Sequence, residues 1–182
     1  PLSHSFSKRY FTEKFEKDFS KYTKIKNAVA VSSATAALHL SLLALGIKKG
    51  DEVLVPDITF AATASSVLMT GATPVLVDVN LDNFTIKLES IKDNITNKTK
   101  CIIPVHLAGI SCDMNYLLKV KKKFKLFMVE DCAHALGTFY NNKHVGTFGE
   151  FGCFSFYPTK NITTLEGGMI VSKSTSLASI TS

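Results

Sequence analysis

The sequence predicts an α/β fold in which a mostly parallel sheet is covered by helices on both faces. Short apolar segments alternate with helical segments along most of the 182 residues, which is the pattern of parallel strands joined by crossover helices. Hydrophobic residues make up 46% and charged residues 20% of the chain, as in a globular protein with one substantial core. We therefore expect residues 1–182 to form a single three-layer domain.

Helical spacing and capping residues mark the predicted helices in order. The first carries a stripe of aromatic residues at helical spacing: Phe11, Phe15, Phe19 and Tyr22. The second follows a Ser-Ser-Ala-Thr cap and stops at Gly46. The predicted helices cover residues 11–22, 36–45, about 61–70, 86–95 and 114–123.

The predicted strands are short apolar runs that lie between these helices. They cover residues 28–31, 51–56, 74–78, 100–105 and 126–130, with shorter strand-like pieces near 137–140, 152–156 and 169–171. Residues 172–182 are rich in Ser and Thr and lack periodicity, so they are interpreted as a frayed or cut-off end.

Charge and cysteine content narrow the function classes. The net charge is +6, and the densest basic run, from Lys119 to Lys125, is typical of the exposed face and end of a helix. Nucleic-acid binding is the alternative for such a run, but no aromatic or Gly-rich motif accompanies it. The four cysteines form no C-x-x-C pair, and the five histidines show no metal-ligand spacing with them. We expect free thiols in a reducing compartment and no metal.

No secretory signal or membrane span is visible in the sequence. The N-terminus lacks a basic region followed by an apolar core. No apolar run reaches the roughly 18 residues that a bilayer span needs. We therefore expect a cytoplasmic protein with no membrane partner.

The most suggestive feature for chemistry is Lys160. It is a lone lysine in an apolar, aromatic-flanked stretch, after a strand-like run and before a Gly-Gly pair that we interpret as a turn. Desolvation disfavours the ammonium form of a lysine, and a neutral amine is what condenses with an aldehyde cofactor. The sequence therefore suggests covalent amine chemistry at Lys160.

Further candidates follow predicted strands, where ligands of open α/β sheets bind. Ala34 and Thr35 lie at a helix N-terminus, which is a natural phosphate site and equally a plain helix cap. Asp131 ends a buried strand, where its charge needs a partner such as a protonated pyridine nitrogen. The alternative for Asp131 is a cap for the next turn.

Three more residues extend this set with weaker signals of their own. Phe60 follows another strand and can stack on a flat cofactor, although a core role is favoured for this segment alone. His134 alone is more often structural than catalytic, and Ser155 can donate to a phosphate oxygen. Together the set supplies a phosphate cradle, a pyridinium partner, a stacking ring and an amine. That combination fits pyridoxal phosphate.

Blocks of this chain, in order, resemble the nucleotide-sugar aminotransferases, the DegT/StrS group of fold-type I pyridoxal-phosphate enzymes. The resemblance runs from about Phe11 to Val171, and its many ordered blocks make it highly specific. The blocks cover residues 28–38, 50–53, 71–75, 104–109 and 130–135, together with the segment around Lys160.

The resemblance implies a role for each candidate residue. Lys160 resembles the lysine that holds the cofactor as an internal aldimine, and Asp131 matches the residue that pairs with the pyridine nitrogen. The phosphate contacts of the family correspond to Ala34, Thr35 and Ser155. The aromatic residue that stacks on the cofactor ring corresponds to Phe60, and the residue near the ring hydroxyl corresponds to His134.

The resemblance also implies a ping-pong transamination. An amino donor, usually glutamate, loads the cofactor, and a keto sugar carried on a nucleotide diphosphate then accepts the amine. Lys160, once released, would move the proton between the substrate carbon and the cofactor carbon. A homodimer is implied as well, with a cross-subunit phosphate contact. One related branch dehydrates sugars and has His in place of the lysine, and Lys160 argues against that branch.

Two departures from the family pattern bear on function. Leu165 stands where relatives carry a small residue, so it could crowd the cofactor loop. Family members are also longer, with a further N-terminal segment and a small C-terminal domain. The alternative to an active enzyme is therefore a non-catalytic remnant that keeps the cofactor motifs. A nicotinamide or nucleoside-triphosphate binder is disfavoured, because neither a G-x-G-x-x-G after a strand nor a P-loop is present.

Overall fold

The computed structural model describes residues 4–175 and confirms the predicted α/β class, with seven strands in one sheet. Only β9 runs antiparallel to its neighbours, and the remaining pairs are parallel. A loop without a crossover helix joins β8 to β9, which suits antiparallel pairing. The strands are, in spatial order, β1 (Asn27–Val31), β9 (Gly168–Ser172), β8 (Phe151–Ser155), β5 (Phe127–Asp131), β4 (Thr99–Ile102), β2 (Glu52–Pro56) and β3 (Thr73–Val77).

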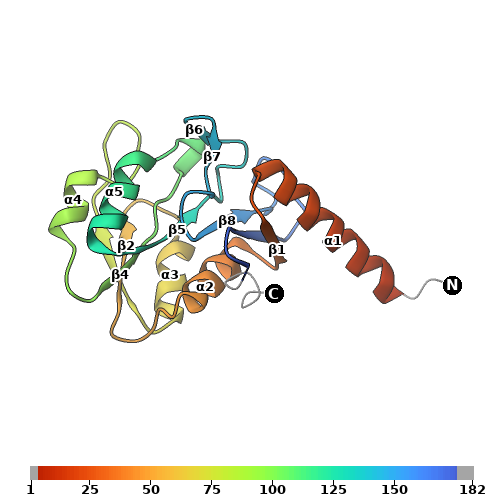
Figure 1. Ribbon diagram of the computed structural model, residues 1–182, viewed down its shortest axis with the longest axis horizontal. Coiled ribbons are helices and arrows are strands. Elements are labelled where there is room, and N and C mark those ends of the chain that lie inside the picture. Colours follow the sequence, from red (N-terminus) through yellow and green to blue (C-terminus); the bar gives the residue numbers. More distant parts are fainter. Residues whose placement is uncertain (1–3, 176–182) are drawn as a thin grey trace.

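Helices cover both faces of the sheet (Figure 1). Val53 and Val55 of β2 belong to the same core as the inner residues of α2 and α3. Leu54, between them, packs with α4 and α5 instead, because successive strand residues point to opposite faces. The helices are α1 (His4–Thr23), α2 (Ala34–Ala44), α3 (Ala61–Met69), α4 (Leu88–Asp93) and α5 (Met114–Phe124), and η1 (Leu107–Gly109) is a short 3₁₀ turn.

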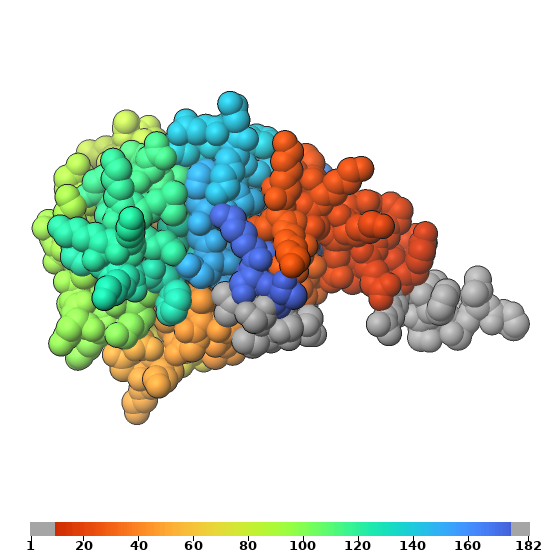
Figure 2. Space-filling model, viewed as in Figure 1, coloured from red at the N-terminus to blue at the C-terminus, as the bar shows by residue number. Residues whose placement is uncertain are grey.

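The aromatic stripe predicted for the first helix is a packing surface. Phe15 and Phe19 of α1 lie edge-on to Phe156, with ring centroids 5.1 and 5.8 Å from it. Glu16 accepts the backbone N–H of Ala30 at 2.8 Å, so α1 also occupies a hydrogen-bonding position on the edge strand β1. In Figure 2 the red and orange N-terminal part lies beside the blue end of the chain, as the β1–β9 pairing requires. The helix α1 therefore packs against β1 and against Phe156, which lies at the start of the loop that carries Lys160.

Some predicted boundaries differ from the structure, and one strand was missed. The first helix, expected over 11–22, begins at His4. The strand expected over 100–105 ends at Ile102, although an isolated bridge still joins Val105 to Asp131. The helix expected over 86–95 is Leu88–Asp93, because Ile86 pairs with Val79 instead. A second hairpin strand, β7 (Lys143–His144), was missed next to β6 (Phe139–Tyr140).

The missed hairpin had a signal in the sequence. Asn141 and Asn142 join β6 to β7, and both have positive φ angles, 47° and 61°. Asparagine tolerates this left-handed conformation, which two-residue hairpin turns require. The Asn-Asn pair therefore indicated a tight turn. Within residues 4–175, no helix is long and apolar enough to cross a membrane.

Candidate functional site

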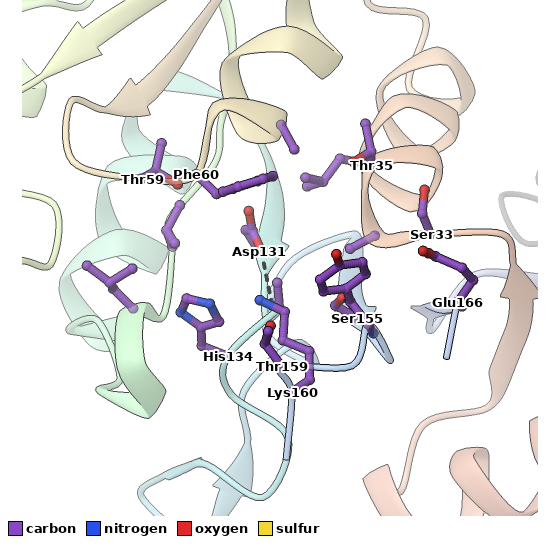
Figure 3. Close-up of a pocket in the computed structure, with 18 residues that line it drawn as sticks. Ser33, Thr35, Thr59, Phe60, Asp131, His134, Ser155, Thr159, Lys160 and Glu166 are labelled. Atoms are coloured by element: carbon purple, nitrogen blue, oxygen red, sulfur yellow. Dashed lines mark hydrogen bonds between the residues drawn. The ribbon is translucent and has the colours of Figure 1, made fainter. Parts of the chain in front are cut away.

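A cavity of about 620 Å³ opens beyond the carboxyl ends of the parallel strands, and all seven candidate cofactor residues line it (Figure 3). The lining includes Ala34, Thr35, Phe60, Asp131, His134, Ser155 and Lys160. These residues come from loops or element ends after β1, β2, β5 and β8. The structure therefore brings together side chains that lie up to 126 positions apart, from residue 34 to residue 160 (160 − 34 = 126).

The N-terminus of α2 supplies unpaired backbone donors to this cavity. Ser33 is its N-cap, and the Ser33 Oγ accepts the N–H of Ala36 at 3.1 Å. The next bond, from the Ala37 N–H to the Ser33 carbonyl, begins the helix. Across residues 4–175 no acceptor is found for the N–H groups of Ala34 and Thr35. Such free donors at the positive end of a helix dipole favour an anion.

Gly168 allows β9 to lie close to the backbone at the N-terminus of α2. A Cβ built on Gly168 would lie 2.5 Å from the carbonyl carbon and oxygen of Ser33, so any larger residue would displace the α2 N-terminus. The sequence interpretation of a Gly-Gly turn is wrong here. Gly168 is the first residue of β9, and Gly167 accommodates the Thr164 hydroxyl, which would be 2.5 Å from its Cβ. These glycines are required by close backbone approach.

Asp131, the last residue of β5, is only 5% exposed, and both its backbone and its carboxylate are hydrogen-bonded. Its backbone N–H donates to the carbonyl of Pro104 at 2.9 Å, and its carbonyl accepts from the N–H of His106 at 3.0 Å. Each carboxylate oxygen has a donor: the Ala133 N–H lies 3.1 Å from Oδ1, and the Thr63 hydroxyl lies 2.8 Å from Oδ2. These bonds fix the orientation of the Asp131 carboxylate at the wall of the cavity.

Lys160 lies in the loop between β8 and β9, and its side chain points toward Asp131 (Figure 3). Its N–H donates to the Tyr157 carbonyl at 2.9 Å. The loop is tied to the buried Phe156, whose carbonyl accepts from the Thr164 N–H at 3.0 Å. Burial lowers the pKa of Lys160 from its usual 10.5, against the opposing effect of the Asp131 charge. The amine therefore becomes neutral at a lower pH than an exposed lysine does.

His134 and Ser155 present polar groups to the same space. The Nδ1 of His134 accepts the N–H of Ala108 at 3.4 Å, which places its proton on Nε2. Burial, followed by the nearby charge of Lys160, lowers the pKa of His134, so the ring is neutral near pH 7. Ser155 ends β8 and accepts the N–H of Tyr157 at 3.4 Å, which leaves its hydroxyl proton for another acceptor.

Phe60 is not a core residue, which was the interpretation favoured from its segment alone. It is 76% exposed and lines the cavity at the N-cap of α3. An exposed ring beside a cavity is available to stack on a planar ligand. The sequence reasoning missed other lining residues, because isolated hydroxyl, phenol and carboxylate groups in loops carry no pattern. They include Thr59, Tyr157, Thr159 and Glu166.

Leu165 does not crowd the cavity. Its side chain is 74% exposed and is not among the lining residues. Its φ angle is +68°, in the left-handed region that is unfavourable for residues with a Cβ by roughly 1–2 kcal/mol. The backbone conformation, rather than the space around the side chain, therefore favours glycine at this position.

Glu130 forms a buried cluster with His106 and Cys132 behind the cavity. It is fully buried, and its carboxylate accepts the backbone N–H groups of Gly146, Phe148 and Gly149 at 2.6 to 2.7 Å. The same carboxylate lies 3.3 Å from His106 Nε2. These bonds fasten the loop before β8 to the end of β5, directly beside Asp131. The sequence reasoning missed this role of Glu130.

Comparison with known proteins gives a consistent result. The family model described as the DegT/DnrJ/EryC1/StrS aminotransferase family matches residues 3–182. The chain is 46% identical over 171 residues to a GDP-perosamine synthase of Escherichia coli O157:H7, covering 94% of this chain and 47% of that protein. The chain thus spans about half the length of the curated relatives it matches.

Solved structures of similar proteins have the same fold. An aminotransferase from Psychrobacter cryohalolentis superposes with a TM-score of 0.92 at 42% identity, covering 93% of this chain and 43% of that one. A sugar aminotransferase of Streptococcus pneumoniae, solved in its PLP form, gives 0.87 at 38% identity, covering 93% and 49%. The fold and the pyridoxal-phosphate class predicted from the sequence are confirmed. The chain belongs to the DegT/DnrJ/EryC1/StrS aminotransferase family.

Proposed function

We propose that this chain carries the cofactor site of a pyridoxal-phosphate-dependent aminotransferase that transfers an amino group to a keto sugar linked to a nucleotide. The observation that carries the proposal is the convergence of Lys160, Asp131 and the N-terminus of α2 on one cavity. Its relatives include GDP-perosamine synthases and other sugar aminotransferases. Lys160 supports amino transfer over the related dehydration chemistry.

The cavity fits each part of pyridoxal phosphate. The free N–H groups of Ala34 and Thr35, with the Ser155 hydroxyl, form a cradle for a phosphate. Asp131 is a buried carboxylate that can pair with a protonated ring nitrogen. Lys160 offers an amine with a lowered pKa to an aldehyde. These groups come from different elements, so the fit depends on the fold.

The chain's own residues then perform the proton chemistry. When bound, pyridoxal phosphate supplies an aldehyde that takes up the amine and a ring that accepts electrons from the adjacent carbon. Lys160 Nζ acts as the base that takes a proton from the amino-bearing carbon of the donor. Asp131 keeps a negative charge at the ring-nitrogen position, and His134 Nε2 can donate to an oxygen on the ring. The aromatic side chain of Phe60 can stack on one face of the cofactor ring.

The donor, the acceptor and the assembly form the finer part of the proposal. We infer glutamate as the donor and a nucleotide-diphosphate keto sugar as the acceptor, in a homodimer with no nucleic-acid or membrane partner. Buried free cysteines, including Cys132 and Cys153, favour a reducing compartment such as the cytoplasm.

The experiment is a single-turnover assay with the purified chain. The chain is loaded with pyridoxal phosphate, freed of excess cofactor and mixed with L-glutamate, and 2-oxoglutarate and pyridoxamine phosphate are quantified. We expect both products in amounts stoichiometric with the bound cofactor. Cofactor binding without either product would support the non-catalytic remnant. Failure to bind the cofactor at all would contradict the proposed function.

A further inference from the structure

The Asp131 carboxylate is connected to the cavity wall by two threonines of the α3 region. Thr63 is fully buried, and its hydroxyl donates to Asp131 Oδ2 at 2.8 Å. Thr59 lines the cavity, and its hydroxyl lies 2.8 Å from that of Thr63. The two threonines are four residues apart and flank Phe60. The segment that carries the candidate stacking ring therefore also carries a donor to Asp131.

The direction of this hydrogen-bond chain follows from counting protons. Each threonine hydroxyl has one proton to donate, and an ionised carboxylate can only accept. Thr63 donates its proton to Asp131, so Thr59 must be the donor in the Thr59–Thr63 pair. The dipoles thus point from the cavity wall toward Asp131, and each bond polarises the next.

We propose that Thr63 is a positioning residue that orients the Asp131 carboxylate, with Thr59 as the cavity-facing end of the same relay. The inference rests on the proposed function, because Asp131 acts only through the ring nitrogen of the cofactor. A second donor, the Ala133 N–H, fixes the other carboxylate oxygen. Only Thr63 supplies a side-chain donor to Asp131 among the described residues, so a single substitution tests the idea.

The test uses Thr63→Val, which keeps the shape of the side chain and removes the donor. Without that donor, the Asp131 carboxylate is less firmly oriented toward the ring nitrogen, which then holds its proton less well. The cofactor ring then withdraws less electron density from Lys160 Nζ. In the cofactor-loaded chain, Nζ therefore keeps its proton to higher pH. We expect the pH midpoint of the cofactor absorbance to rise by up to about one unit. Cofactor binding should weaken about tenfold.

Three further variants separate a positioning role of Thr63 from a general effect on the stability of the fold. Thr63→Ser restores the hydroxyl and should restore the midpoint. Thr59→Val, on the cavity wall, should shift it in the same direction by a smaller amount. Ser66→Ala removes another fully buried hydroxyl from α3, one that donates to the Thr63 carbonyl at 2.8 Å and not to Asp131. We expect Ser66→Ala to lower stability without moving the midpoint.

The outcomes distinguish this inference from the proposed function. If the wild-type chain binds no pyridoxal phosphate, both are overturned. If the wild-type chain binds it and Thr63→Val has the wild-type midpoint, or shifts no more than Ser66→Ala, only the role of Thr63 is overturned. Should Thr63→Val fail to fold, an unchanged midpoint in Thr59→Val would overturn the relay.

Discussion

Lys160→Ala is expected to lower the rate of the glutamate half-reaction by about 10²-fold to 10⁴-fold, the usual contribution of a positioned general base. The physical reason is that no other amine lines the cavity within the described residues. His134 is nearby, but its neutral ring already uses Nδ1 as an acceptor for the Ala108 N–H. The measurement is the single-turnover rate of 2-oxoglutarate formation in cofactor-loaded protein.

The control for this variant is Lys98→Ala, which removes an exposed lysine far from the cavity lining. Its single-turnover rate should match the wild type. Added methylamine should partly restore the rate in Lys160→Ala, because a small amine can occupy the space that the side chain leaves. A wild-type rate in Lys160→Ala would remove this residue from the mechanism. No rescue in a folded variant would argue against a base at this position.

Asp131→Asn is expected to slow the same half-reaction by about 10²-fold to 10⁴-fold. Removing one partner of a buried ion pair costs about 3–5 kcal/mol, and each 1.36 kcal/mol corresponds to a factor of ten in rate. Asparagine has nearly the same shape as aspartate, so the substitution tests the charge of Asp131 rather than its volume, although the amide can accept from only one of Thr63 and Ala133. The readouts are the single-turnover rate and the dissociation constant for pyridoxal phosphate.

A matched control is available at the end of another strand. Asp57 follows β2 as Asp131 ends β5, but Asp57 is exposed and does not line the cavity. Asp57→Asn should therefore bind the cofactor and react as the wild type does. Equal effects of the two substitutions would mean that the buried charge of Asp131 has no special role.

The sequence could predict residues that line the cavity because each follows a recognisable break in structure. Asp131 and Ser155 end strands, and Ala34 begins a helix after a Ser cap. Such positions are where parallel sheets bind ligands. The order of strands and helices was equally readable, because apolar runs and helical spacing are local patterns.

The parts that the sequence did not predict depend on contacts between distant segments. Thr63 looks like any residue of an Ala/Ser-rich helix, and its bond to Asp131 joins positions 68 apart in sequence. Glu130 holds backbone N–H groups of a loop 16 to 19 residues later. The effect of Leu165 lies in a φ angle of +68°. None of these leaves a periodic signal.

The most direct test of the central claim is to find where pyridoxal phosphate attaches. The purified chain is incubated with the cofactor, reduced with borohydride and digested, and the labelled peptide is identified by mass spectrometry. We predict one labelled peptide, with the cofactor on Lys160, and its loss in Lys160→Ala. Absence of label, or label on other lysines that persists in Lys160→Ala, would contradict the assignment of this cavity as the cofactor site.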